Sequence, residues 1–454
     1  MKIASNFLLT LPAVLLCSAA PSSAAVVGVF HNNYGNSGTQ SIFVFGAAGT
    51  TGSLVRGTDS TAFAIDNSGI YTFSLGEGTN AMTQGGEINT LAFRIDANSP
   101  ISAIALNRER YTTDQTNLLD VEALGRDHVV LTTTGTFGGS QMSVTAVEDG
   151  TEVQITSPVD LNGNPANTPI NVTLNKGESV FYTSNSGSDL SGARVTANKD
   201  IAVFAGAECT NVPVGVSACD HLISQQYSVD NFDTEFLISN SYGNGELGDL
   251  VRVVGATDNT EVFLNGVSQG TINAGQVLTL DAGDGGVLTS SQPVTVGQFM
   301  RGQEQRQAGI GDPAYEIIPS TDQFLSSYFY ATPVGADAFT LNYLSLAIAE
   351  SEASSLKLNG SSVDTSAFSN ISGWLFGTLA INTGIGTIEA ANPFLATISG
   401  YSDYDSYFST IATAFSPGVS PPVDPAPVPV PAAFPLLGAG LGILGLLRRK
   451  RRSA

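Results

Sequence analysis

The sequence predicts an all-β protein made of tandem β-sandwich modules of about 100 residues each. Two observations support this prediction. The 454 residues include 49 glycines and only 13% charged residues, a composition that favours strands and turns over helices. Similar segments also recur along the chain at a nearly fixed period, and such a period is the signature of repeated structural units.

The most regular repeat is a segment that reads as two short strands around a polar turn. Its apolar residues alternate with a period of two, which is typical of β-structure. The four copies lie at 93–106, 193–206, 286–299 and 386–399. The eighth position of each copy is Pro or Asp, namely Pro100, Asp200, Pro293 and Pro393, at spacings of 100, 93 and 100 residues. Four modules are therefore expected.

A second segment recurs earlier in three of the modules. Residues 142–156 contain Asp149-Gly150 between two alternating apolar runs, a pattern that predicts a β-hairpin. Residues 251–266 repeat it, and 344–360 repeat it more loosely with Glu352 at the turn. Each module then contains seven or eight short strands, as expected for a two-sheet, Ig-like sandwich. A propeller is less consistent with the sequence, because its period would be near 45 residues.

Both ends of the chain read as targeting segments. Residues 1–25 have one basic residue, an apolar run and a small-residue end, which predicts a signal peptide cleaved after Ala25. Near the other end, 16 apolar residues at 432–447 would span about 24 Å as a helix, short of the roughly 30 Å hydrocarbon core. We expect a marginal transmembrane helix followed by a cytoplasmic basic cluster, Arg448, Arg449, Lys450, Arg451 and Arg452.

The repeats and the ends together give a domain organisation. The predicted parts are a signal peptide at 1–25, β modules at 26–112, 113–206, 207–302 and 303–416, a Pro-rich linker at 417–431, a transmembrane helix at 432–447 and a basic cytoplasmic tail at 448–454. The third module contains both cysteines that remain after signal cleavage.

The charge of the chain excludes some partners. Lys2 and the five basic residues at 448–452 lie outside the region 26–447, which keeps 12 basic and all 40 acidic residues and a net charge of −28. Such a surface repels nucleic acid and anionic lipid. It suits an extracellular protein.

The C-terminal residues resemble a known sorting signal. The motif Val428-Pro429-Val430-Pro431-Ala432, followed by an apolar helix and an arginine cluster, is similar to the VPLPA type of PEP-CTERM signal, with Val430 in place of Leu. The resemblance implies an inner-membrane intermediate, an exosortase-like membrane peptidase that removes the helix, and delivery to the cell surface or matrix. The alternative is a plain transmembrane anchor that is never cut.

Cys209 and Cys219 are expected to form one disulfide. An exported chain meets an oxidising compartment, and closing a loop of this length contributes about 2–3 kcal/mol. A redox or metal-binding pair is not favoured, because the chain has neither a CxxC motif nor a third cysteine after signal cleavage.

The region around these cysteines resembles the IgGFc-binding domain family. The similarity is carried by CTNVPVGVSACDHL at 209–222, the preceding ANKDIAVFAG, the EDGTEV and TDNTEV turns, and PSTDQFLSSYFYATP at 319–333. It extends over roughly 41–348. The resemblance implies an extracellular β-rich recognition or matrix module and no chemistry. It does not imply immunoglobulin binding, because no residue matches an Fc contact.

Candidate catalytic groups are few. His31, His128 and His221 have no metal-ligand spacing. Asp220 and His221 are adjacent with Ser224 nearby, but neighbours in a strand point to opposite faces, so a structural role is expected. The other conspicuous acids occupy repeated turns and serve the backbone there: Glu148, Asp149, Asp258, Glu261, Asp281 and Asp284.

No cofactor is expected, while a bound Ca²⁺ stays an open alternative that cannot be assigned to a site. Residues 160–165 begin like an EF-type loop, but Pro165 stands where glycine is required. The acidic loops 281–286 and 403–405 show no coordination pattern.

These observations predict an exported, non-enzymatic structural or adhesion protein of the cell surface or biofilm matrix. The expected partners are the sorting peptidase and exopolysaccharide or other matrix proteins. The alternatives are a secreted polysaccharide hydrolase, which needs two carboxylates about 5–10 Å apart in a pocket, and a permanently anchored receptor or S-layer-like protein.

Overall fold

A computed structural model describes residues 24–35, 38–77 and 80–415. Most of the predicted signal peptide, the Pro-rich linker, the transmembrane helix and the basic tail lie outside these residues. Within the described part, no helix is long and apolar enough to cross a membrane.

The described residues form 33 strands and six short 3₁₀ turns, which group into four units. Unit 1 (24–118) contains β1 (Ala24–Gly28), β2 (Phe30–His31), β3 (Thr39–Gly46), β4 (Thr51–Arg56), β5 (Asp59–Ala64), β6 (Ile70–Glu77), β7 (Ala81–Met82), β8 (Ile88–Asn89), β9 (Phe93–Ala97), β10 (Ile101–Glu109) and β11 (Thr112–Leu118). Unit 2 (125–226) contains β12 (Gly125–Val129), β13 (Phe137–Ala146), β14 (Thr151–Thr156), β15 (Ile170–Leu174), β16 (Ser179–Thr183), β17 (Arg194–Thr210) and β18 (Asp220–Gln226).

The second half of the chain repeats this series. Unit 3 (233–318) contains β19 (Asp233–Ile238), β20 (Leu250–Gly255), β21 (Thr260–Leu264), β22 (Val267–Ile272), β23 (Val277–Asp281), β24 (Gly286–Phe299) and β25 (Tyr315–Ile318). Unit 4 (325–410) contains β26 (Leu325–Ala331), β27 (Leu341–Ala349), β28 (Lys357–Leu358), β29 (Ser361–Ser362), β30 (Ser369–Ile371), β31 (Trp374–Ile381), β32 (Ile385–Ser402) and β33 (Asp405–Thr410). The 3₁₀ turns are η1 (Val121–Ala123), η2 (Val229–Asn231), η3 (Gln303–Gln305), η4 (Thr321–Gln323), η5 (Gly335–Asp337) and η6 (Glu350–Ser355).

All four units share one antiparallel topology. In unit 2, one layer has the order β12-β17-β14-β15 and the other the order β18-β17-β13-β16. Unit 3 repeats these layers as β19-β24-β21-β22 and β25-β24-β20-β23, and units 1 and 4 follow the same order. The predicted all-β class and the fourfold repeat are therefore confirmed.

The repeated 14-residue segment is a bent strand shared by both layers, rather than two strands around a turn. In β24, residues 286–290 pair in one layer and 294–299 in the other, while 291–293 have no ladder partner. Pro293 and Pro393 occupy this unpaired bend, where a missing N–H costs no ladder hydrogen bond. Only unit 1 breaks the strand here, into β9 and β10.

The predicted hairpins are wrong. The Asp149-Gly150 turn connects β13 to β14, but these strands do not pair with each other, because each pairs with a different half of β17. β20 and β21 are related in the same way through β24. An alternating strand reads the same in sequence whether it pairs with its neighbour or crosses to the opposite layer of one core.

The shared strand also distinguishes the structure from the predicted Ig-like sandwich, which has two separate sheets. Because β17, β24 and β32 run through both layers, units 2, 3 and 4 are each a single sheet that curls around its core, whereas unit 1 has two separate four-stranded sheets. The sheets also pass the predicted boundaries at 112, 206 and 302, since they end at 118, 226 and 318. The reason is a further strand that follows each repeated segment and pairs with it: β11, β18, β25 and β33.

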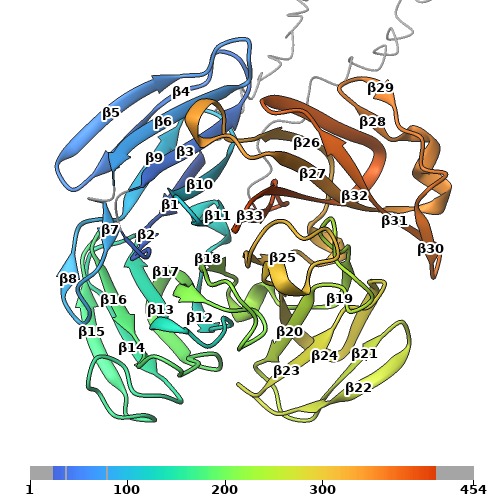
Figure 1. Ribbon diagram of the computed structural model, residues 1–454. Coiled ribbons are helices and arrows are strands. Elements are labelled where there is room, and N and C mark those ends of the chain that lie inside the picture. Colours follow the sequence, from blue (N-terminus) through green and yellow to red (C-terminus); the bar gives the residue numbers. More distant parts are fainter. Residues whose placement is uncertain (1–23, 36–37, 78–79, 416–454) are drawn as a thin grey trace, which may run out of the picture. The chain divides into compact units, whose positions relative to one another are not determined.

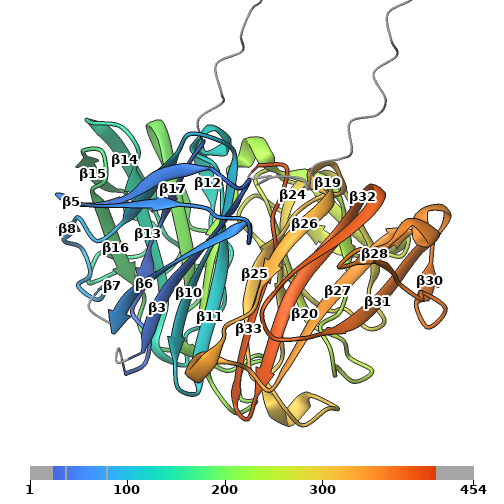
Figure 2. The same ribbon diagram turned by 90° about the horizontal axis from the view of Figure 1, so that it is seen from above.

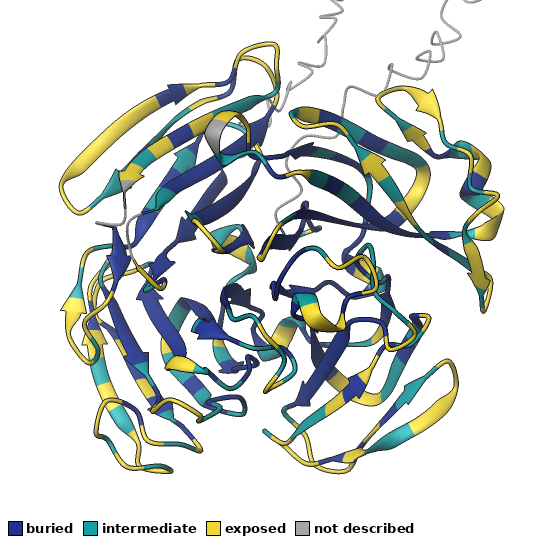
Figure 3. Cartoon of the chain, in the orientation of Figure 1, coloured by how far each residue is buried: buried dark blue, intermediate teal, exposed yellow. Residues whose placement is uncertain are grey.

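These four last strands of the units lie at the centre, and we call them the inner strands. β11 contacts β18, β18 contacts β25, β25 contacts β33 and β33 contacts β11. The units therefore form a closed ring around the inner strands (Figures 1 and 2). Each unit also has its own apolar core, and the outer strands are the more exposed ones (Figure 3).

A second ring of hydrogen bonds joins the connections between units. The Gln323 side chain donates to the Asn231 carbonyl (3.1 Å), and the Asn231 side chain donates to the Ala123 carbonyl (2.7 Å). The segment after β33 completes the series, because Ala414 N–H donates to the Gln323 carbonyl (2.9 Å) and its neighbour Phe415 accepts from Asp120 N–H (3.1 Å). The last described residues thus supply the fourth connection.

Close backbone contact between units 2 and 3 requires a glycine. Gly192 has φ +87°, and a Cβ there would lie 2.3 Å from the Gly275 carbonyl oxygen. We expect Gly192→Ala to lower the free energy of unfolding by about 1–3 kcal/mol more than Gly187→Ala. Gly187 is the matched control, because it has φ +83° and no atom within 4 Å of its added Cβ. Urea denaturation of both variants measures this difference, and equal losses would contradict the close contact.

Candidate functional site

The inner strands are buried, although β11, β18 and β33 are rich in polar residues. Every residue of β11, TTDQTNL, and of β18, DHLISQQ, is buried. β25 and β33 are buried throughout as well (Figure 3). Because buried polar groups are costly without partners, their hydrogen bonds decide what the centre does.

Side chains of β11 bind the backbone edge of β18 at every second residue. The Thr112 hydroxyl accepts from His221 N–H (2.9 Å), and the Thr116 hydroxyl accepts from Gln225 N–H (3.0 Å). Between them, Asp114 accepts from Ile223 N–H (3.1 Å). This spacing follows from the period of two in strands. Side chains thus replace a neighbouring strand at this sheet edge, and we call the arrangement the edge ladder.

Asp114 joins the units at the centre. Its Oδ2 also accepts from Tyr315 N–H of β25 (3.1 Å), and Phe408 N–H of β33 approaches the same carboxyl. Ser224 of β18 continues the pattern by accepting from Ile317 N–H (2.9 Å). One carboxyl of unit 1 therefore contacts the backbone of the three other inner strands.

Burial shifts the ionisation of the central acids. The pKa values of Asp114, Asp220 and Glu316 are raised well above their ordinary values, mainly by desolvation. Burial raises the pKa of Asp312 to about 7. The pKa of Asp405 is also raised by burial, although its ion pair with Arg108 opposes the shift.

The three histidines occupy separate buried positions. His31 Nε2 lies 2.8 Å from the Ser143 hydroxyl, and His128 Nε2 lies 3.4 Å from the Gly125 carbonyl. His221 Nε2 lies 3.3 Å from the Asn107 amide. Burial lowers the pKa of His128 and His221 to about 4 and that of His31 well below its ordinary value, so all three are neutral near pH 7.

The residues weighed as a triad do not form one. Asp220 accepts from the backbone N–H of His221 (2.7 Å) rather than from its imidazole. The Ser224 hydroxyl accepts a hydrogen bond from Ile317 N–H of β25. The three residues belong to the contacts between inner strands.

The predicted disulfide between Cys209 and Cys219 is present, with a Cα–Cα distance of 5.2 Å. It connects the end of β17 to the start of β18. Within the loop that it closes, the Val212 carbonyl accepts from Gly302 N–H (2.8 Å) of the segment after β24. The disulfide therefore holds a loop that contacts unit 3.

The acidic loops weighed as calcium sites have protein partners. Asp160 accepts from Ala166 N–H (2.8 Å), Asp281 pairs with Arg301, and Asp403 accepts from the Gln303 amide (3.2 Å). No group of three or more His, Cys, Asp or Glu residues in the described part of the chain is arranged to hold a metal ion.

Acidic side chains at the repeated turns accept hydrogen bonds from backbone N–H groups. Asp149 accepts from Lys176 N–H (2.9 Å), and Glu178 accepts from Asn175 N–H (2.7 Å). The turn in unit 3 is built alike, because Asp258 accepts from Ala274 N–H (3.0 Å).

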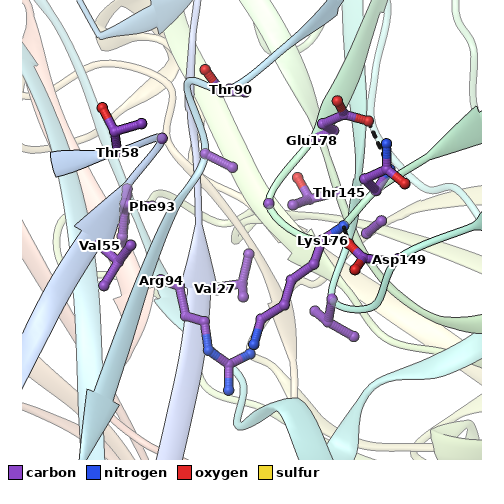
Figure 4. Close-up of a pocket in the computed structure, with 16 residues that line it drawn as sticks. Val27, Val55, Thr58, Thr90, Phe93, Arg94, Thr145, Asp149, Lys176 and Glu178 are labelled. Carbon is purple, nitrogen blue, oxygen red and sulfur yellow. Dashed lines mark hydrogen bonds between the residues drawn. The ribbon is translucent and has the colours of Figure 1, made fainter. Parts of the chain in front are cut away.

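A cleft of about 660 Å³ lies between units 1 and 2. Most of its lining surface is apolar, and polar and charged side chains contribute the rest (Figure 4). The lining residues are Val27, Val55, Gly57, Thr58, Thr90, Ala92, Phe93, Arg94, Thr145, Ala146, Val147, Asp149, Asn175, Lys176, Gly177 and Glu178. The side chains of Arg94 and Lys176 extend toward each other, one from each unit (Figure 4). This cleft is the candidate binding site.

Sequence reasoning missed both the edge ladder and the cleft. The alternating Thr112, Asp114 and Thr116 are a local signal for the ladder, although a polar segment of this kind more often indicates a loop. Nothing in the sequence around Arg94 or Lys176 predicts a shared site, because the two residues come together only in the folded chain.

The residues predicted for processing are mostly outside the described region. This applies to the sorting motif at 428–432 and to the basic residues 448–452. Ala25 is described and is buried in β1, where it pairs with Asp96 of β9. Cleavage after Ala25 would remove two residues of that strand.

The ring and the disulfide define an all-β module whose four units are held together by contacts between their inner strands. The family model described as IgGFc binding protein matches residues 114–400, and the chain belongs to this family. The predicted resemblance to the IgGFc-binding domain family is therefore confirmed, although the match covers 114–400 rather than roughly 41–348. The resemblance of the C-terminal residues to a sorting signal stays a prediction.

Comparison with individual proteins gives two further findings. The human IgGFc-binding protein is 26% identical over 289 residues, which are 62% of this chain and 5% of that protein. A solved structure described as a Ca²⁺-stabilized adhesin that helps an Antarctic bacterium reach out and bind ice is 12% identical. That comparison covers 87% of this chain and 99% of the other, but its TM-score of 0.13 is too low to inform the fold.

Removing the Asp114 carboxyl should weaken the ring. Asp114→Ala leaves buried N–H groups of Ile223 and Tyr315 without an acceptor, and each such group costs about 1–3 kcal/mol. We expect the free energy of unfolding to fall by about 3 kcal/mol or more, as measured by urea denaturation. Asp284→Ala, in an exposed loop, should have little effect. Equal stability of the two variants would rule out Asp114 as the central contact.

The raised pKa of Asp312 predicts a pH effect. Its folded-state pKa is about 7 against an ordinary value of 3.8, so its contribution to stability is complete below about pH 4 and is lost as the pH rises through 7. The lowered pKa values of the histidines act in the opposite direction below about pH 6.5. Asp312→Asn isolates the aspartate, because the amide is neutral at every pH.

The measured quantity is the stability of Asp312→Asn minus that of the unmodified protein. We expect this difference in the free energy of unfolding to rise by an amount on the order of 1–4 kcal/mol between pH 4 and 7. Urea denaturation at several pH values measures it. A difference that does not change with pH would contradict the raised pKa.

Proposed function

We propose that this protein is an exported, non-enzymatic structural or adhesion module of the cell surface or extracellular matrix. The observation that carries the proposal is that buried polar and ionisable side chains at the centre bind other parts of the protein. Asp114 and Ser224 bind backbone of neighbouring units, and the His221 imidazole lies against an amide. The family relationship, to a protein whose name describes binding, supports a recognition role.

Export is supported by the disulfide and by the charge. A Cys209–Cys219 bond is maintained in oxidising compartments and is rare in the cytosol. The strongly acidic composition favours a solvated surface that does not bind nucleic acid.

The route to the surface is the second part of the proposal. The chain passes through an inner-membrane intermediate held by residues 432–447, and an exosortase-like peptidase recognises Val428-Pro429-Val430-Pro431-Ala432 and releases the body. Exopolysaccharide or other matrix proteins are the proposed partners there. The arrangement of motif, apolar run and basic cluster at 448–452 supports this route.

Replacing both prolines of the motif tests the route. In the native host, Pro429→Ala with Pro431→Ala should move the protein from the extracellular to the membrane fraction at full length. Pro421→Ala with Pro422→Ala, in the linker, is the matched control and should leave sorting unchanged. Fractionation with intact-mass measurement follows both variants. A mature, unmodified protein that still contains residues 448–452 would instead indicate a permanent anchor.

A further inference from the structure

The cleft lies at a junction that differs by one side chain from the equivalent junction between units 2 and 3. Aligned on Pro100 and Asp200, Ala92 of unit 1 corresponds to Gly192 of unit 2. Gly192 lies against Gly275 of the next unit, so closely that a Cβ there would be 2.3 Å from its carbonyl oxygen. At the junction of units 1 and 2, Ala92 and Gly177 instead lie on the lining of the open cleft. The added methyl group of Ala92 is incompatible with the closed contact.

The turn that faces this cleft has a lysine that the turn itself does not need. In unit 2, Asp149 and Glu178 accept from the backbone of the turn at 175–178. In unit 3, Asp258 and Gln276 make the same two bonds around Ala274, which takes the place of Lys176. The repeated architecture therefore forms with alanine at this position.

The cations of the cleft are available to a ligand. In the described part of the chain, the Lys176 ammonium has no hydrogen-bond or ion-pair partner. Arg94 pairs through Nε with Asp96 (2.7 Å), and one of its two terminal nitrogens lies toward Lys176 (Figure 4). The nearby Asp149 and Glu178 each use an oxygen for the turn. The two converging cations favour an anion with planar oxygens, which guanidinium binds well. The carboxylates of Asp149 and Glu178 in the same lining and the negative net charge of the chain oppose this attraction, so the anion must be bound between the two cations.

The remaining lining narrows the class of ligand. Val27, Val55 and Ala146 give a small aliphatic wall, while Thr58, Thr90 and Asn175 give hydroxyl and amide groups. A sugar ring presents both C–H faces and several hydroxyls, and a uronic acid adds the carboxylate. A pocket of about 660 Å³ is within the range of ligand-binding sites.

We propose that the cleft between units 1 and 2 binds a uronic-acid unit of an acidic polysaccharide, with its carboxylate between Arg94 and Lys176. This inference rests on the proposed matrix role for its choice of ligand. The two remain separable, because fractionation tests the location of the protein and direct binding tests the cleft.

Calorimetric titration of the full mature chain with hexagalacturonate tests the proposal, with cellohexaose as the neutral probe. We expect hexagalacturonate to bind and cellohexaose to bind at least about tenfold more weakly. Lys176→Ala, which installs the residue found in the unit 3 turn, should weaken hexagalacturonate binding about tenfold or more. Arg94→Gln should do the same, with urea denaturation showing that both variants remain folded.

Lys357→Ala is the matched control, because it removes the same charge from a half-exposed position in unit 4. It should leave hexagalacturonate binding unchanged. An equal loss in this control would assign the effect to long-range charge and overturn the proposal. Absence of hexagalacturonate binding would overturn it too, as would Lys176-dependent binding of octa-glutamate in its place, which would indicate an acidic peptide ligand.

Discussion

The hydrogen bonds between inner-strand side chains and neighbouring strand edges are the constraint on which the fold depends. A sheet edge presents unpaired N–H and C=O groups that invite another strand. Here the edge of β18 meets Thr112, Asp114 and Thr116 of β11 instead. At the centre, the units are thus joined through side chains, whereas β8 of unit 1 pairs with β16 of unit 2 at the periphery. The cost is a centre made of buried polar residues, which must all be correctly placed.

This constraint explains the distribution of chemically conspicuous residues. Asp114, Asp220 and Glu316 have raised pKa values in a buried cluster, a combination that often marks an active site. Their contacts point to a different role, because Asp114 accepts backbone N–H groups and Glu316 lies within reach of Thr410 (3.3 Å) and Asn117 N–H (3.4 Å). Structural networks shift pKa values as strongly as catalytic ones do. The geometry of the partners distinguishes the two.

Local features were predictable from sequence, and long-range pairing was not. The fourfold repeat and the disulfide follow from spacing and composition. The partners of β13 and β14 do not, since a strand alternates in the same way in a hairpin and in a crossing between layers. TTDQTNL resembles a loop by composition, and only the closure of the ring buries it. Arg94 and Lys176 become neighbours only through the junction of two units.

Repetition provides the means to separate architecture from function in this chain. A feature that recurs among the units, such as the bent strand shared by both layers in units 2, 3 and 4 or the acid at the turn in units 2 and 3, is needed to build a unit. A feature that differs from its counterparts in the other units is not needed to build a unit, so a functional reason for it is expected. Two residues depart from their counterparts at the same junction. Ala92 stands where unit 2 has Gly192, which makes a close contact, and Lys176 stands where the unit 3 turn has Ala274. Two independent departures at one cleft are difficult to attribute to folding alone, because the equivalent junction closes without either of them.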